Sequence, residues 1–226
     1  MARARAYYEE FAGGYTEAAA EAGWSLNGRL GASLSGVRPV HRAVDLACGT
    51  GETLRELARA LPGAALVGVD LAGSMADRSA ARVPSATVVR DDLRSFVAAT
   101  PDGWFDVVTC IGGLEFVPHL PALLAGLGRV VAPGGRLVVT YEPLLPGWPA
   151  QADREGTDLG SNGLDLTTFR WEPAEVIAPF ADWTVVEDVV LPAYRRDGVP
   201  TVYAWLHLVR PPGAADRVSS RGSSPG

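Results

Sequence analysis

The sequence predicts an α/β fold, in which helices cover both faces of a mostly parallel sheet. Short valine-rich runs alternate with helical segments between residues 37 and 142, a pattern typical of right-handed βαβ units. Two strand-like runs, 183–191 and 201–210, follow with only a short connection that contains Asp-Gly and Pro. Because that connection is too short for a crossover helix, we expect an antiparallel hairpin at the end of the sheet.

The elements of this fold follow one another in a regular order. The first strand is expected at 43–47 and the helix after it at 53–61. The remaining strands and helices then alternate, and a Pro-Gly-Gly turn precedes the strand at 136–142. We expect strands at 65–70, 86–92, 105–111 and 136–142, and helices at 73–80, 120–131 and 173–180.

The 226 residues, of which 47% are hydrophobic, suffice for one domain with one substantial core, expected at 1–210. The cofactor-binding core would span 37–142, and the last helix and hairpin 172–210. Residues 1–36 are expected to form a cap of two helices broken by Gly13-Gly14. Residues 143–171 lack clear periodicity for most of their length and are expected to form a lid over the substrate. The tail, 211–226, is rich in Pro, Gly and Ser and is expected to be disordered.

Charge and cysteine content exclude several classes of function. The net charge is −6 and no block of Lys or Arg occurs, which argues against nucleic acid or an anionic membrane as a partner. No apolar run approaches the ~20 residues of a membrane span, and the first residues do not look like a signal segment, so we expect a cytoplasmic protein. Cys48 and Cys110 have no Cys-x-x-Cys partner or nearby His, so no metal site is predicted.

The stretch Asp-Leu-Ala-Cys-Gly-Thr-Gly, residues 45–51, lies between the first strand and the first core helix. Such a glycine turn serves either a dinucleotide, through its pyrophosphate, or S-adenosylmethionine, through its amino-acid part. Dinucleotide sites have a third glycine where this chain has Leu54. Asp45 would repel a pyrophosphate but attract an ammonium and a sulfonium, so the turn favours S-adenosylmethionine.

Acidic residues also end the next two strands. Asp70 can accept hydrogen bonds from both ribose hydroxyls, which occurs in either cofactor class. At the third strand, 91–93, a carboxylate can bind the exocyclic amine of an adenine while a backbone N–H meets a ring nitrogen. Three strand ends thus offer contacts for an amino acid, a ribose and an adenine, in that order.

Five segments in order, 43–52, 66–75, 88–96, 105–117 and 127–143, together resemble the class I S-adenosylmethionine-dependent methyltransferases. The resemblance implies a Rossmann-like sheet of seven strands, S-adenosyl-L-methionine as the cofactor and S-adenosyl-L-homocysteine as the product. It implies that the methionine part binds at the first strand end, the ribose at the second and the adenine at the third, with the fourth strand end beneath the methyl donor. The implied cofactor residues are Tyr15, Asp45, Ala47, Gly49, Gly51, Asp70, Leu71, Met75, Asp92, Leu93, Cys110 and Ile111.

Residues for the reaction itself are harder to assign. His119 and Glu142 follow the fourth and fifth strands and are the candidate bases. The alternative for His119 is a solvated residue at a helix start, and for Glu142 an anchor for the lid. Many members of the family carry histidine at the position of Phe116, so their mechanism does not transfer directly. The candidate substrate residues are Tyr7, Glu115, Phe116, Trp148, Arg170 and Trp171, each of which can instead serve packing.

The sequence therefore predicts transfer of a methyl group to a small-molecule acceptor by a monomer or homodimer. The Ala-, Gly-, Pro- and Arg-rich usage suggests a bacterial enzyme of secondary metabolism. One alternative is an enzyme that binds S-adenosylmethionine but catalyses a cyclisation or rearrangement. A non-catalytic binding subunit and a nicotinamide-dependent reductase are further alternatives, which the intact glycine turn and the missing third glycine respectively disfavour.

Overall fold

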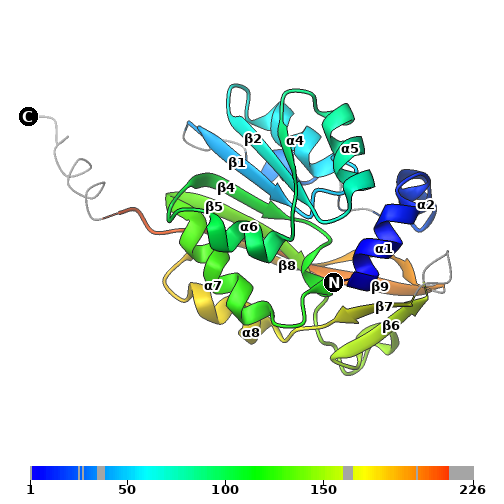
Figure 1. Cartoon of the computed structure of the whole chain (residues 1–226). Coiled ribbons are helices and arrows are strands. Elements are labelled where there is room, and N and C mark those ends of the chain that lie inside the picture. The colour runs from blue at the N-terminus through cyan, green and yellow to red at the C-terminus, as the bar shows by residue number, and fades with distance from the viewer. Residues whose placement is uncertain are drawn as a thin grey trace, which may run out of the picture.

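The computed structural model describes residues 2–24, 26, 28–34, 39–159, 165–196 and 198–213. Its main sheet has seven strands in the order β3-β2-β1-β4-β5-β9-β8. The first five pair in parallel, β9 pairs antiparallel with both β5 and β8, and the order reverses between β1 and β4 (Figure 1). The strands are β1 (Arg42–Leu46), β2 (Ala65–Asp70), β3 (Thr87–Arg90), β4 (Phe105–Cys110), β5 (Val131–Tyr141), β8 (Thr184–Arg196) and β9 (Val199–Val209).

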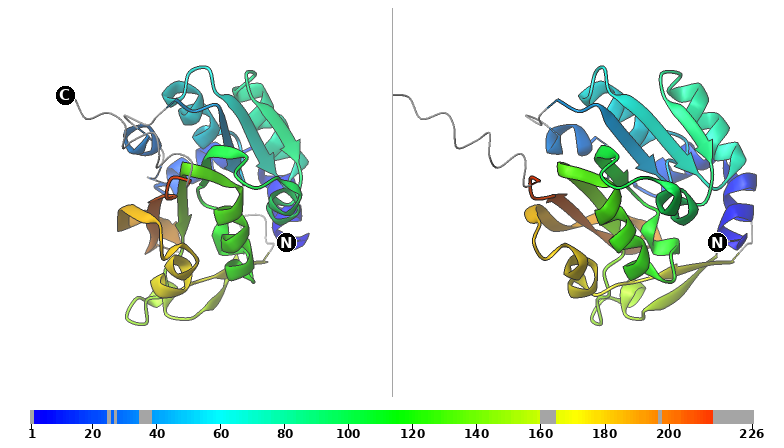
Figure 2. Two further views of the ribbon diagram at one scale, coloured as in Figure 1. Left: turned by 90° about the vertical axis from the view of Figure 1, so that its left-hand side faces the viewer. Right: turned by 60° about the vertical axis from the view of Figure 1, so that its left-hand side comes forward.

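Helices cover both faces of this sheet (Figures 1 and 2), as the sequence predicts. On one face α6, α7 and α8 contribute to the larger hydrophobic core, and on the other α3 and α4 contribute to a second core. Both cores are apolar because parallel strands are buried on their two sides. The helices are α3 (Leu30–Ser33), α4 (Glu52–Ala60), α5 (Gly73–Arg82), α6 (Leu93–Ala99), α7 (Leu120–Val130) and α8 (Pro173–Ile177). Short 3-10 turns are η1 (Leu114–Phe116), η2 (Pro149–Gln151) and η3 (Ala178–Phe180).

The N-terminal segment confirms the expected break at the two glycines. Helix α1 (Ala2–Phe11) ends before them and α2 (Tyr15–Glu21) begins after them. Both lie beyond the carboxyl ends of the parallel strands (Figure 1). The helices therefore lie at the sheet edge where ligands bind in folds of this kind.

The segment 143–171 differs from the expectation of a loop without regular structure. It contains an antiparallel pair, β6 (Glu155–Leu159) and β7 (Asp165–Phe169), which forms a separate two-stranded sheet. A two-stranded hairpin needs other contacts to be stable, and β7 packs against α1 and η1. Because these partners are distant in sequence, local periodicity could not predict the hairpin.

Three smaller differences concern one additional helix and the boundaries of three strands. Helix α6 was not expected, although Asp92 provides its N-cap through a hydrogen bond from the Arg94 N–H. Strands β8 and β9 extend into the connection between them and leave a tight turn that includes Gly198. Strand β5 begins at Val131, before the expected Pro-Gly-Gly turn, where its pairing with β4 is irregular. Of the predicted disordered tail, residues 214–226 lie outside the described residues.

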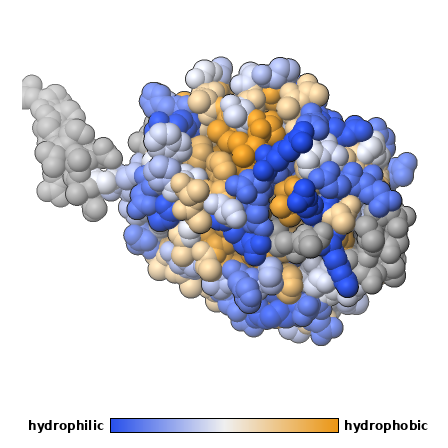
Figure 3. All heavy atoms as spheres, in the orientation of Figure 1, coloured by the Kyte–Doolittle hydropathy of each residue, from blue (hydrophilic) through white to orange (hydrophobic). Residues whose placement is uncertain are grey.

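The hydrophilic character of the surface is consistent with apolar residues being buried in the two cores. On the face shown in Figure 3, hydrophilic residues predominate, and apolar residues gather in one area of its upper half. No helix in the part of the chain that the structure describes has the length and apolar character needed to cross a bilayer.

Candidate functional site

A cavity of about 310 Å³ lies where the strand order reverses. The loops after β1, β2, β3 and β4 form one side of it, and α1, α2 and the residue Trp24 form the other. Crevices at this position of an open α/β sheet are the usual ligand sites of such folds. Residues that line the cavity include Arg5, Tyr8, Tyr15, Thr16, Trp24, Ala47, Cys48, Gly49, Thr50, Asp70, Leu71, Met75, Asp91, Leu93, Ile111, Gly112 and Phe116.

The glycine turn after β1 brings backbone to the cavity wall. Gly49 and Gly51 have φ angles of +52° and +86°, which favour glycine. A Cβ on Gly51 would lie 2.8 Å from Ser79 Oγ, so this glycine lets α4 pack closely against α5. Gly51 itself does not line the cavity, whereas Ala47 and Gly49 do, as predicted. Gly51 therefore shapes the turn through its close packing against Ser79 of α5 and not through contact with the cavity.

Ala47 also has a positive φ, +54°, and it is the one non-glycine residue with this geometry among those that the structure describes. We expect Ala47→Gly to raise the free energy of unfolding by about 1 kcal/mol, because L residues pay roughly that cost in this region. Urea denaturation measures the change. The control, Ala65→Gly in strand β2, should lower stability by about 0.5–1 kcal/mol. Equal losses in both variants would contradict a strained Ala47.

Asp70 joins two of the loops. Its Oδ2 accepts a hydrogen bond from the Gly49 N–H at 2.8 Å and its Oδ1 one from the Ala72 N–H at 2.9 Å. Burial raises its pKa, and these two backbone donors oppose the shift. Asp70 therefore holds the glycine turn and the start of α5 in place while it faces the cavity. Leu71 and Met75 line the same wall, as predicted.

Asp45 lies one layer beneath this wall. Thr109 Oγ1 donates a hydrogen bond to its Oδ1 at 2.7 Å, and its Oδ2 has no hydrogen-bond partner among the described residues. The side chain is buried, and burial raises the pKa of Asp45 to about 7. A buried carboxylate with one unpartnered oxygen is stabilised by a nearby cation. Asp45 does not line the cavity itself, but its buried carboxylate suits a cationic group bound above it, such as the amino group of S-adenosylmethionine.

The third strand end corrects one prediction. Asp91 and Leu93 line the cavity, but Asp92 does not. The Asp92 carboxylate caps α6 and forms an ion pair with Arg94, with Nη2 and Oδ2 2.6 Å apart. The hydrogen bond from Arg94 lowers the pKa of Asp92. Asp91 is therefore the carboxylate of this strand end that faces the cavity, and the capping position before α6 is the signal that distinguishes the two residues.

At the fourth strand end Ile111 lines the cavity as predicted, with Gly112 beside it, whereas Cys110 lies fully buried beneath them. Gly112 has a φ of +74°, and a Cβ there would lie 2.9 Å from Trp24 Cη2. The glycine thus allows the Trp24 ring to close over this loop. Burial raises the pKa of the Cys110 thiol well above its ordinary value, which leaves it unreactive.

Aromatic rings form the wall opposite the carboxylates. Tyr15, predicted for the cofactor, and Phe116, predicted for the substrate, line it, and the cap residues Tyr8 and Trp24 do so as well. The rings of Tyr8 and Phe116 meet edge to face at 5.7 Å between centroids. Tyr7, proposed for the substrate, is buried instead against Tyr8 and outside the cavity.

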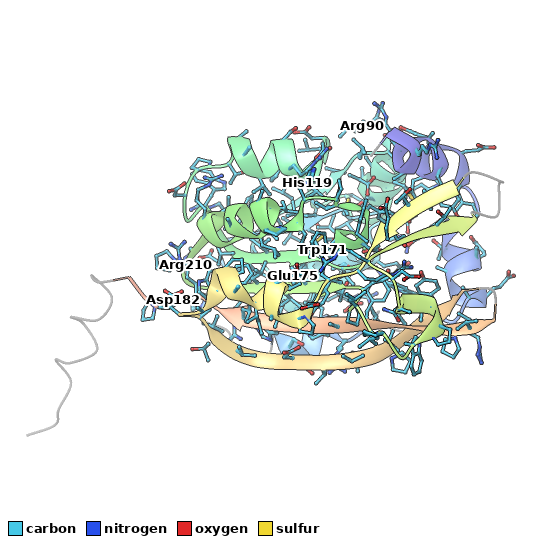
Figure 4. The ribbon with its side chains drawn as sticks, turned by 90° about the horizontal axis from the view of Figure 1, so that it is seen from below. Arg90, His119, Trp171, Glu175, Asp182 and Arg210 are labelled. Atoms are coloured by element: carbon cyan, nitrogen blue, oxygen red, sulfur yellow. The ribbon has the colours of Figure 1, made fainter. Side chains whose placement is uncertain are left out.

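Two further predicted residues lie away from the cavity. His119 is exposed at the N-cap of α7 (Figure 4) and does not line the cavity, so its assignment as a base is not supported. Trp148 lies at the surface, where its Nε1 donates to the Pro200 carbonyl at 2.7 Å. Sequence could not place either side chain, because each depends on the path of a loop.

Three more predicted residues belong to a buried polar cluster behind the aromatic wall: Glu115, Glu142 and Arg170. Arg170 Nε lies 3.0 Å from Glu142 Oε2, and Tyr194 donates to the other oxygen of Glu142. Tyr203 donates to Glu115 Oε1 at 2.7 Å, and its ring packs against Trp24. None of the five side chains in these three polar contacts lines the cavity, so Glu142 is not supported as a base.

Trp171, labelled in Figure 4, is also buried outside the cavity, and the guanidinium of Arg154 lies over its ring. Like Arg170, it follows β7 and helps to fix the β6–β7 hairpin to the core, through a bridge between Trp171 and Pro143. The predicted substrate role of this pair is therefore replaced by a structural one. The described residues hold no group of three or more His, Cys, Asp or Glu side chains arranged to bind a metal ion.

Comparison with known proteins agrees with this geometry. A protein family described as a methyltransferase domain matches residues 43–135. The ubiquinone/menaquinone biosynthesis C-methyltransferase of Burkholderia orbicola is 35% identical over 185 residues, which cover 76% of each chain. The chain belongs to the class I S-adenosylmethionine-dependent methyltransferase family. S-adenosylmethionine is the cofactor of this family.

The chain spans half the length or less of several other curated members of the methyltransferase family. The trans-aconitate 2-methyltransferase of Deinococcus radiodurans is 35% identical over 103 residues, 45% of this chain and 38% of that relative. An S-adenosylmethionine-dependent methyltransferase from Methanosarcina mazei shares the fold, with a TM-score of 0.64 at 14% identity over 78% of this chain and 95% of the other. The [4+2]-cyclase SpnF shares it too, with a TM-score of 0.60 at 18% identity over 82% of each chain. The fold therefore accommodates more than one reaction.

Proposed function

We propose that this protein transfers a methyl group from S-adenosylmethionine to a small aromatic acceptor. One observation carries the proposal: a single cavity has the carboxylates of Asp70 and Asp91 on one wall and four aromatic rings on the other. Cofactor and acceptor need these two kinds of surface side by side, because methyl transfer requires close alignment in a dry pocket.

The cofactor is assigned to the loops after the first three strands. Ala47 and Gly49 would hold the methionine part above Asp45, Asp70 would accept the ribose hydroxyls, and Asp91 would face the adenine. A dinucleotide fits less well, since Asp45 would repel its pyrophosphate. Leu54, at the position of the third glycine, is fully buried against β2, which supports the same choice.

The acceptor is assigned to the end of the cavity formed by Tyr8, Tyr15, Trp24 and Phe116. Burial raises the pKa of Tyr15 to about 12, and the negative charge of Glu115 contributes to the shift. The pKa of Tyr8 is raised by burial and by the same carboxylate. This negative surrounding favours a neutral or cationic acceptor over a polycarboxylate. An aromatic acceptor can also stack on the rings.

S-adenosylmethionine, when bound, would supply a methyl group from its sulfonium sulfur. The neutral thioether that remains, S-adenosylhomocysteine, is a good leaving group. The protein then contributes alignment and exclusion of water. In this assignment the cap helices exclude water through Tyr8, Tyr15 and Thr16, and Thr16 Oγ1 lies 3.4 Å from Thr50 Oγ1 across the cavity mouth.

Asp70→Asn is expected to weaken S-adenosylmethionine binding about tenfold, because the amide keeps only one acceptor oxygen for the ribose and the two loop N–H groups. Isothermal titration calorimetry of the wild type and the variant measures this. NADH serves as the competing ligand and should not bind. Binding of NADH, or no binding of S-adenosylmethionine by the wild type, would contradict the cofactor assignment.

The acceptor class is tested by turnover with small aromatic hydroxyl compounds and with trans-aconitate as the polycarboxylate comparison. We expect S-adenosylhomocysteine to appear only with the aromatic compounds. Turnover with trans-aconitate alone would contradict the aromatic assignment. Expectations of a cytoplasmic location, of secondary metabolism and of a monomer or homodimer stay predictions.

A second candidate keeps the cofactor but replaces methyl transfer with a cyclisation or rearrangement. It is favoured by the finding that both predicted bases, His119 and Glu142, lie outside the cavity. Product formation without stoichiometric S-adenosylhomocysteine would support this candidate, whereas one equivalent per product would exclude it.

A further inference from the structure

Glu9 links the N-terminal cap to the cofactor side of the cavity. Its carboxylate accepts hydrogen bonds from the backbone N–H groups of Gly73 at 2.6 Å and Ser74 at 2.9 Å. The Ala72 N–H, one residue earlier, donates to Asp70. Three consecutive N–H groups at the start of α5 therefore end on carboxylates, and the second carboxylate comes from a helix more than sixty residues away.

A second contact reinforces the first. Ser74 Oγ donates to the Glu9 carbonyl at 2.9 Å and to the Tyr8 carbonyl at 3.3 Å, at the last turn of α1. Glu9 and Ser74 thus bind each other through both backbone and side-chain groups. The Glu9 side chain is 35% exposed and lies 3.8 Å from Arg5.

The cap packs separately from the two main cores. Ala12 and the rings of Tyr8 and Tyr15 form a small cluster with Ala72 and Met75. None of these residues belongs to either core that surrounds the sheet. Segments with few buried contacts open at a lower free energy than the rest of a protein.

The residues on both sides of the Glu9 contact line the same cavity. Arg5 and Tyr8 line it from α1, and Leu71, Ala72 and Met75 line it from the loop and helix after β2. A cofactor bound between them would contact both α1 and this loop, and movement of α1 away from the loop would widen its path out of the cavity. The Glu9 contact therefore lies at the boundary between these two segments.

We propose that Glu9 is a positioning residue, which holds α1 closed over the bound cofactor and orders the loop that carries Asp70. The inference rests on the proposed function, since it assigns the cofactor to this cavity. Glu9 touches backbone of the loop rather than the cavity, so its effect on the cofactor is indirect. Cofactor exchange, rather than folding, is the property that it controls.

The test compares the wild type with Glu9→Gln, Ser74→Ala and the control Glu17→Gln, which replaces an exposed glutamate of α2. Dissociation of tritiated S-adenosylmethionine, chased by unlabelled ligand, gives the exchange rate. We expect dissociation to be about tenfold faster in Glu9→Gln and about threefold faster in Ser74→Ala, because charged hydrogen bonds are lost in the first and neutral ones in the second. Glu17→Gln should match the wild type.

Hydrogen exchange separates positioning from a general loss of stability. We expect faster exchange in α1 of Glu9→Gln and unchanged exchange in β1 and β4, which a global loss of stability would not produce. Unchanged dissociation rates in both Glu9→Gln and Ser74→Ala would overturn the inference while leaving the proposed function intact. Failure of the wild type to bind S-adenosylmethionine would instead overturn the proposed function.

Discussion

Replacing Arg170 with methionine is expected to lower the free energy of unfolding by about 3–5 kcal/mol, because one partner of a buried ion pair is removed. The side chains of Arg170 and Glu142 are 5% and 0% exposed, and their charged atoms lie 3.0 Å apart. A Cβ on Gly156 would collide with the Arg170 guanidinium, so this side chain also fills the space beside β6. Chemical denaturation measures the loss.

Two variants control this prediction. Arg90→Met removes an ion pair with Asp77 at the surface, with side chains 59% and 66% exposed, and should change stability by less than about 1 kcal/mol. The double variant Glu142→Gln with Arg170→Met removes both charges and should be more stable than Arg170→Met alone. A double variant that is less stable by the full sum of the single losses would show that the pair does not act as a unit.

Because strand β7, which directly precedes Arg170, contacts α1 and η1, the loss at Arg170 should extend to the cavity. Phe116 belongs to η1 and lines the acceptor end. We therefore expect Arg170→Met to weaken acceptor binding more than cofactor binding, although Arg170 lines neither part.

Replacing Asp45 with asparagine is expected to have opposite effects on stability and on cofactor binding. Burial raises the folded-state pKa of Asp45 to about 7, above its value of 3.8 in the unfolded chain. The folded state therefore holds a proton that the unfolded state has lost between these pH values. Stability decreases as the pH rises from about 4 to about 7, and the whole cost is present above pH 7.

Asparagine removes this cost, because it stays neutral and still accepts the Thr109 hydrogen bond. At pH 8 we expect the ligand-free Asp45→Asn variant to be more stable than the wild type by up to about 4 kcal/mol, at about 1.4 kcal/mol for each pH unit between the two pKa values. At pH 4 the difference should vanish. Denaturation at both pH values measures it, and the same difference at pH 4 and pH 8 would contradict a titrating Asp45.

For the cofactor we expect Asp45→Asn to lose roughly 100-fold in affinity, because the ammonium group assigned to the site above it loses the attraction of a buried negative charge. In the wild type, affinity should rise with pH up to about 7, with release of a proton on binding at lower pH. Calorimetry in buffers of different ionisation enthalpy detects that proton. An affinity that is independent of pH between 5 and 8 would contradict an electrostatic interaction between the Asp45 carboxylate and the cofactor.

Local sequence patterns predicted most strands of the main sheet. The runs that became β1, β2, β4 and β9 are apolar and β-branched, and their neighbours in the sheet follow from the βαβ rule. The β6–β7 hairpin escaped prediction because its stability comes from contacts with α1 and η1. Helix α6 was missed although Asp92 marks its start.

The site follows the same division. The glycine turn, Asp70, Leu71, Met75 and Ile111 could be placed from the sequence, because the carboxyl ends of parallel strands meet at one edge of a sheet. Neighbouring side chains at a strand end point in different directions, so the choice between Asp91 and Asp92 required recognition of helix α6, which Asp92 caps. Nor could the sequence decide which aromatic residues of the cap line the cavity, where the structure places Tyr8 and Trp24 but not Tyr7.

By itself, the sequence determined the family, the parallel sheet and the loops at its carboxyl edge, because these depend on periodicity and on the spacing of a few glycines and carboxylates along the chain. Only the tertiary structure decided which charges are buried and which aromatic rings line the cavity. Glu142 and Arg170 form a buried ion pair outside the cavity, and Glu9 reaches a helix that begins at Gly73. Both contacts join residues that are distant in the chain but close in space. Burial there lowers the effective dielectric constant and so strengthens the interaction between charges.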